Sequence, residues 1–153
     1  MTKLADALYA LAIALWVGGL FAIGYLAAPV LFAQLSDRIL AGNLAGAMFA
    51  LIAWIGIGCA SYLLVFQLGR HGWRALKLST FWLVTIMLLL TVAGHFGVQP
   101  ILAQLKADAL PRQVMESALR DRFATWHGIS SGLYMLQSLL GLWLVVWQER
   151  GRR

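Results

Sequence analysis

The chain has 153 residues, of which 61% are hydrophobic and 12% are charged, whereas about 25% of the residues in a typical soluble domain are charged. This composition excludes an ordinary soluble domain, and the length suits a single transmembrane domain over residues 1–153. The formal net charge of +6 does not indicate a nucleic-acid partner, because the basic residues stand near the ends of apolar runs and form no continuous basic face.

Four runs contain no Asp, Glu, Lys or Arg, and each is longer than the roughly 20 residues that cross a bilayer as a helix. The runs predict an all-α transmembrane four-helix bundle with up-down-up-down topology, surrounded by the lipid bilayer. The predicted helices cover about 8–28, 43–67, 78–98 and 125–147.

Small residues recur every four positions in the first two predicted helices. The first contains Gly18 and Ala22, and the second contains Gly42, Gly46 and Ala50. Such tracks let two helices approach closely in lipid. Helices one and two are therefore predicted to pack against each other most tightly at their outer halves.

Pro29 is predicted to end or kink the first helix, because proline has no backbone N–H and clashes with the preceding turn. The connection that follows contains Asp37 and Arg38, which are predicted to form a local ion pair. Together with Asp121 and Arg122 they would close a salt-bridge lid over the bundle. The alternative is that both are surface pairs, worth about 0–1 kcal/mol each.

Pro100 is predicted to close the third helix and to begin the longest loop, residues 101–125. Within that loop Pro111 suits the first position of a helix, and apolar residues recur on one side of the segment that follows. The pattern predicts an amphipathic interfacial helix over about 111–123, between helices three and four, lying across the mouth of the bundle.

The fourth helix carries one stripe of polar and small residues at helical spacing on an otherwise apolar surface. A polar stripe that faces hydrocarbon is costly, so this one is predicted to face other helices or a wet cavity. The stripe consists of His127, Ser130, Ser131, Tyr134, Gln137, Ser138 and Gly141.

Two histidines are the first candidates for chemistry. His95 near the end of the third helix and His127 near the start of the fourth are predicted to lie at equal depth and to share one cavity. Two imidazoles there would hold haem iron, copper or zinc, with Ser131 and Tyr134 as further ligand contacts and Met48 as a thioether ligand for a metal. The alternatives are that each histidine hydrogen-bonds a neighbouring group and pins two helices, or that it lines a proton or substrate path.

The distribution of Lys and Arg predicts the orientation. Seven stand on the side of both termini and the 69–77 turn, and five stand on the opposite side. The 69–77 turn holds three basic residues and no acidic one. Both termini are therefore predicted to be cytoplasmic in the inner membrane of a bacterium, and residues 101–125 periplasmic.

Four motifs stand in order along the chain: Leu15-Trp-Val-Gly-Gly-Leu, Ala28-Pro-Val-Leu-Phe, Ala41-Gly-Asn-Leu-Ala-Gly, and Phe123 with His127-Gly-Ile-Ser-Ser. Together they resemble a bacterial four-helix membrane family of unknown function. That family is related to eukaryotic TMEM-type proteins, which carry a similar His-Gly-x-Ser-Ser element. Tyr134 departs from the Asn expected in those relatives. The resemblance implies the fold and the membrane location.

More distantly, the Trp-x-Gly-Gly start and the paired helix-end histidines resemble the copper-resistance D membrane domain and the HemJ-type haem-pathway proteins. This second resemblance implies copper or haem as a cofactor. The leading hypothesis is a non-catalytic module that binds or passes a small ligand or transition metal at its outer mouth. The alternatives are a haem-linked redox enzyme, and a structural or assembly subunit that docks a partner helix or a second copy of the chain.

Overall fold

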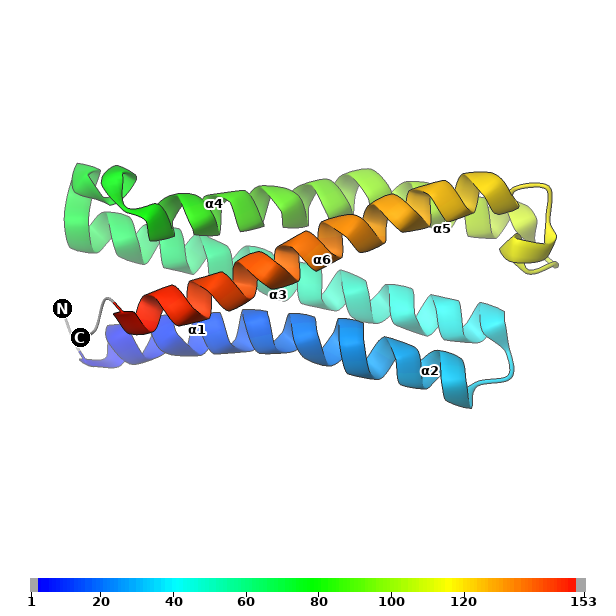
Figure 1. Cartoon of the computed structure of the whole chain (residues 1–153), viewed down its shortest axis with the longest axis horizontal. Helices are drawn as coiled ribbons and strands as arrows, with labels where there is room; N and C mark the ends of the chain where they lie inside the picture. Colours follow the sequence, from blue (N-terminus) through cyan, green and yellow to red (C-terminus); the bar gives the residue numbers. More distant parts are fainter. Residues whose placement is uncertain (1–2, 151–153) are drawn as a thin grey trace.

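The computed structural model describes residues 3–150, and the side chains of residues 3–148. The helices join end to end into four long rods (Figure 1). The first rod comprises α1 (Lys3–Phe21), the π-helical η1 (Ala22–Ala27) and α2 (Ala28–Gln34), and the second comprises α3 (Arg38–His71) and the 3-10 helix η2 (Gly72–Lys77). The third comprises α4 (Ser79–Val92), the π-helical η3 (Ala93–Val98) and α5 (Gln99–Ala109), and after the short η4 (Val114–Glu116) the fourth is α6 (Arg120–Arg150).

The four rods pack as an antiparallel ring. α1 contacts α3 and α6, and α4 contacts the same two helices from the other side. The start of α1 and the last turns of α6 lie at one end of the bundle, called here the closed end; the α2–α3 and α5–α6 connections lie at the other, the open end (Figure 1). Each rod is long and apolar enough to cross a membrane. The predicted all-α four-helix bundle is confirmed, and the chain is a multi-pass membrane protein.

Neither proline ends its helix, so the rods run past the ends predicted near residues 28 and 98. Pro29 and Pro100 each follow a π-helical stretch, η1 or η3, and the chain continues as α2 for 7 residues and as α5 for 11 residues. A proline ring crowds the carbonyl four residues earlier and donates no hydrogen bond. The wider turn of a π-helix relieves this crowding, and the helix therefore continues.

The connection before α6 differs from the amphipathic helix predicted over 111–123. Only the three residues of η4 are helical between α5 and α6, because α5 takes up the first part of the predicted loop and α6 begins at Arg120. Ser117 stabilises a turn here: its Oγ donates to Val114 O at 2.8 Å and accepts from Leu119 N at 3.1 Å. Such local side-chain bonds compete with helix formation.

The core occupies the closed half of the bundle, and Trp16 is its largest side chain. Trp16 is fully buried, and its indole lies against Gly56 of α3, where an added Cβ would overlap the ring. Any side chain at this position would therefore displace the indole or push α1 away from α3. Apolar residues from all four rods surround the pair: Ile13, Val17, Leu20, Ile52, Ala60, Leu63, Val84, Met87 and Leu144.

The close approach predicted for the outer halves of the first two helices is wrong. A Cβ placed on Gly18 would meet no neighbouring segment within 4 Å. The atom nearest to a Cβ placed on Gly42 or Gly46 is Lys106 Nζ, at 3.7 and 4.0 Å. The small residues of α3 therefore make room for a lysine from α5, and not for the first helix.

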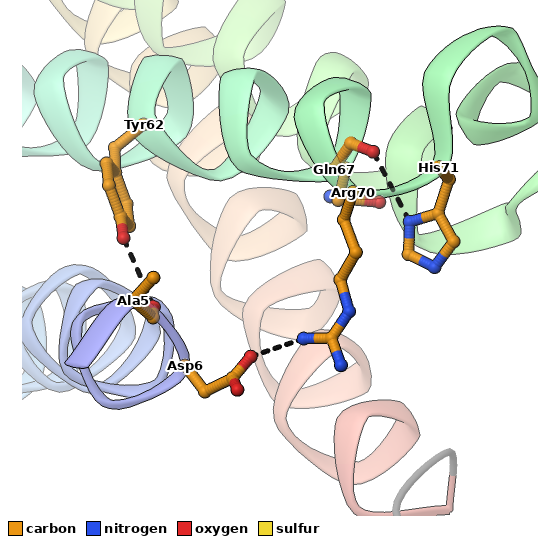
Figure 2. Close-up of polar contacts among 6 residues, drawn as sticks. All are labelled: Ala5, Asp6, Tyr62, Gln67, Arg70 and His71. Atoms are coloured by element: carbon orange, nitrogen blue, oxygen red, sulfur yellow. Dashed lines mark hydrogen bonds and ion pairs between the residues drawn. The ribbon is translucent and has the colours of Figure 1, made fainter. Parts of the chain in front are cut away.

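Polar contacts fasten α1 to the last turns of α3 at the closed end (Figure 2). Asp6 forms an ion pair with Arg70, and Tyr62 Oη donates a hydrogen bond to Ala5 O at 3.2 Å. Since these partners are about 60 positions apart in the sequence, they fix the start of the first rod against the end of the second.

Asp37 and Arg38 bind backbone groups at the open end, and the ion pair predicted between them is wrong. Asp37 Oδ1 accepts from the N–H groups of Ile39 and Leu40 at 2.9 and 3.1 Å and so caps the N-terminus of α3. Arg38 Nη1 donates to Phe32 O in the last turn of α2. Both side chains thus satisfy backbone groups that a helix end leaves free. The described side chains form no salt-bridge lid at this end.

Replacing Gly56 with valine is expected to destabilise the detergent-solubilised protein by about 1–3 kcal/mol, the usual cost of overpacking. The measurement is the thermal unfolding temperature. Gly58→Val is the matched control, because Gly58 lies on the same helix and a Cβ there meets nothing within 4 Å. Equal losses for the two variants would show that Trp16 moves aside and that its contact does not hold α1 to α3.

Candidate functional site

A large cavity opens between the two helix pairs at the open end. The pair α2–α3 separates there from the pair α5–α6 (Figure 1), and the space between them measures about 1570 Å³. All four rods and the connection before α6 line it. Typical pockets for drug-sized ligands measure about 300–1,000 Å³, so this one has room for a larger molecule.

Three cationic side chains line the cavity near its mouth. Arg38 comes from the start of α3, Lys106 from α5, and Arg112 from the connection before α6. No Asp or Glu lines the cavity within residues 3–148. Among the side chains that line the cavity, the positive charge at the mouth therefore has no balancing carboxylate, and such a lining attracts anionic groups.

Lys106 reaches across the mouth from α5 to α3. Leu102, one turn before the lysine, is buried and lines the cavity as well, so the half-buried Lys106 lies on the side of α5 that faces the cavity. Lys106 Nζ donates a hydrogen bond to Gly42 O at 3.1 Å. An ammonium group has three donors, so two remain for a bound molecule.

Apolar and aromatic side chains form the walls, and Tyr134 is the most firmly held of them. Its Oη donates to Leu20 O at 2.6 Å, its ring covers Gly24, and Phe49 meets it edge-on with ring centroids 5.1 Å apart. The hydroxyl is thus bound to a backbone carbonyl, and Tyr134 presents its ring to the cavity. Further wall residues are Tyr25, Phe32, Ile39, Phe96, Leu133 and Met135.

Five of the seven residues of the polar stripe of α6 line this cavity, and both candidate histidines line it as well. The other two, Ser138 and Gly141, lie outside the lining. His95 lies in η3 and packs edge-on against Trp54 and Phe96, with ring centroids 5.4 and 4.7 Å away. His127 is exposed and stacks on Phe123 at 5.6 Å. The two imidazoles therefore share a cavity but lie in different surroundings.

The equal depth predicted for the two histidines is wrong. Gln137 Nε2 donates to Thr91 Oγ1 at 2.9 Å, so these two residues are level. His127 stands ten residues from Gln137 toward the open end, or ~15 Å, whereas His95 stands only four residues, or ~6 Å, from Thr91. The prediction failed because it counted inward from helix ends that the two prolines do not set.

The other predicted ligands do not converge on the histidines. Ser131 lines the cavity, but its Oγ donates to His127 O at 2.9 Å, within its own helix. Met48 is half-buried on α3 and is not among the residues that line the cavity. Within the described part of the chain, no group of three His, Cys, Asp or Glu side chains is placed to hold a metal ion.

Polar side chains also gather at the inner end of the cavity, called here the floor: Trp16, Thr91, His95 and Gln137. Thr91 accepts the bond from Gln137 and donates its own hydroxyl to Met87 O at 2.9 Å. Trp16 Nε1, Gln137 Oε1 and His95 Nδ1 are buried without a hydrogen-bond partner among residues 3–148. Buried polar groups without partners are costly.

Sequence reasoning did not identify the cationic mouth or the floor. Lys106 was treated as a loop charge, although Leu102, Leu105 and Ala109 repeat at helical spacing after Pro100 and indicate that the helix continues. No signal in the sequence singles out Trp16 as a floor residue. The indole lies where it does because Gly56 of α3 leaves room for it, and the sequence alone does not show that Gly56 faces α1.

Comparison with known proteins gives a family but no activity. The family DUF4149, a domain of unknown function, matches residues 11–111. This region begins within α1, continues to the end of α5 with His95 and Lys106, and ends before α6. The searches of curated proteins and of solved structures each returned no match. Since the matched region covers about two thirds of the 153 residues, the chain belongs to the DUF4149 family of domains of unknown function.

Proposed function

We propose that this protein is a non-catalytic, membrane-embedded binding protein for an anionic amphiphile. The observation that carries the proposal is the cationic mouth of the apolar cavity, formed by Arg38, Lys106 and Arg112 with no carboxylate among the lining side chains. An anionic head group at the mouth would accept charge-assisted hydrogen bonds. The apolar body of the molecule would fill the cavity between the aromatic walls.

The shape of the cavity favours binding over permeation. Toward the closed end it stops at Trp16 and Ile52, and beyond them lies a packed layer that includes the fully buried Leu63, Val84 and Leu144. A molecule that enters from the open end therefore meets a closed core. Binding, release at the same mouth, or handover to a partner at that mouth all fit this geometry.

A metal as the main ligand is less well supported than an amphiphile. The volume of about 1570 Å³ far exceeds what an ion requires, and the two histidines differ in depth by ~9 Å along the helices.

Haem is a distinct case, because it is itself an apolar molecule with two carboxylates and His95 has an unpartnered Nδ1 among the described residues. A visible absorption spectrum of the purified protein after addition of haemin distinguishes haem from other amphiphiles. A Soret shift that His95→Ala abolishes would favour the haem-linked alternative.

The proposal places the closed end in the cytoplasm of a bacterium, so that the cavity opens to the periplasm. The motivation is the basic closed end, where Arg70, Arg74 and Lys77 flank a turn without acidic residues. An alkaline phosphatase fused after Arg153 is expected to be inactive, and the same reporter inserted after Pro111 is expected to be active. The reverse pattern would turn the cavity toward the cytoplasm.

The binding proposal predicts that labelled hexadecanoate binds saturably to the protein in nanodiscs of zwitterionic lipid. Lys106→Met keeps the side-chain stem and removes the ammonium, and it is expected to weaken binding about tenfold, the value of a lost bond to a charged group. Arg112→Gln is expected to weaken binding by a smaller factor, and added salt should weaken binding to the unmodified protein.

The matched control is Lys77→Met, which removes an exposed lysine from the closed end, far from the cavity. Its affinity should equal that of the unmodified protein. Hexadecanol, which has the same chain without the charge, should bind more weakly than hexadecanoate. Absence of saturable binding, or equal loss in Lys106→Met and Lys77→Met, would exclude the cationic mouth as an anion site.

A further inference from the structure

The floor of the cavity contains two polar side chains that are almost completely buried and incompletely bonded. Trp16 has 0% of its surface exposed and Gln137 has 4%. Trp16 Nε1 is a donor without an acceptor, and Gln137 Oε1 is an acceptor without a donor, among the described residues. Both side chains line the cavity. A site in the hydrocarbon layer that offers one donor and one acceptor fits an oxygen-bearing group.

The floor residues come from different rods but lie in one layer. Gln137 is level with Thr91 through their hydrogen bond, and His95 follows Thr91 by one turn of the same rod. Trp54 contacts the His95 ring and is two residues from Gly56, on which Trp16 rests. The residues that carry the unpartnered atoms therefore lie at depths that differ by about one helical turn, ~5 Å.

We propose that the floor binds a second polar group of the same ligand, a hydroxyl or carbonyl oxygen at the apolar end of the amphiphile. A hydroxyl would accept from Trp16 Nε1–H and donate to Gln137 Oε1, and both buried atoms would then be satisfied. This inference rests on the proposed function, because it takes the anionic group at the mouth as the other end of the molecule.

The distance from mouth to floor suits a single long chain. Lys106 stands fifteen residues along the rod from Thr91, or ~22 Å, and its side chain leans toward the N-terminus of its helix, which is toward the floor. The lysine stem thus covers part of that distance. The remainder is close to the length of one acyl chain, which spans half of the ~30 Å hydrocarbon core of a bilayer.

The test compares hexadecanoate with 16-hydroxyhexadecanoate, which differ only by a hydroxyl at the far end. The hydroxylated acid is expected to bind about fivefold to tenfold more tightly to the unmodified protein, as one or two buried hydrogen bonds provide. In Gln137→Met, which keeps the length of the side chain and removes the amide, the ratio of the two affinities should fall to about one. Trp16→Phe should reduce the ratio in the same direction.

Gln67→Met is the matched control for folding. Like Gln137, Gln67 is almost completely buried, with 3% of its surface exposed. Its Oε1 accepts a hydrogen bond from Thr80 Oγ1 at 3.1 Å, and its Nε2 has no partner among the described residues. Unlike Gln137, it lies at the closed end, outside the cavity. It should lose stability as Gln137→Met does and keep the affinity ratio of the unmodified protein. Two equally bound acids would overturn the floor site and leave the proposed function standing, whereas binding of neither acid would overturn both.

Discussion

The indole of Trp16 resting on Gly56 is the contact on which the rest of the bundle depends. It brings α1 and α3 together at the middle of their length and gives the closed half a dry core. Toward the open end two further close contacts join the rods, Gly19 with Ile52 and Gly24 with Tyr134, whereas Gly42 faces a lysine. The helix pairs separate there, and the cavity is the result. The same side chain thus ends the core and begins the floor of the cavity.

The architecture follows from the sequence because hydrocarbon imposes a strict rule. A segment that crosses a bilayer must satisfy its own backbone hydrogen bonds and carry few charges, so the charge-free runs predict four helices. The lengths of those helices do not follow from the charge-free runs. Pro29 and Pro100 end a helix by local rules, yet a π-helical turn before each one lets it continue. Whether a π-turn forms depends on packing against neighbouring helices, and one sequence alone does not contain that information.

The site was predictable where it depends on one helix and not where it depends on two. The spacing of His127, Ser131 and Tyr134 places them on one face of α6, and that face does line the cavity. The relative depth of His95 and His127 required the register between two helices, which the Gln137–Thr91 hydrogen bond sets. Lys106 was missed for a related reason, because its part in the mouth depends on the continuation of the third rod past Pro100.

The π-helical stretch η3 also decides which way α5 faces. A π-turn takes one more residue than an α-helical turn, and each residue of an α-helix turns the side-chain direction by about 100°. Every residue after η3 is therefore rotated by that angle relative to an unbroken α-helix. In this rotated phase Lys106 reaches across the mouth, Leu102 lies in the cavity wall, and the buried Leu105 lies outside the cavity lining. The six residues of η3 therefore determine the direction in which Lys106 points relative to α4. A change in the helix type of η3 would rotate α5 and move this positive charge at the mouth.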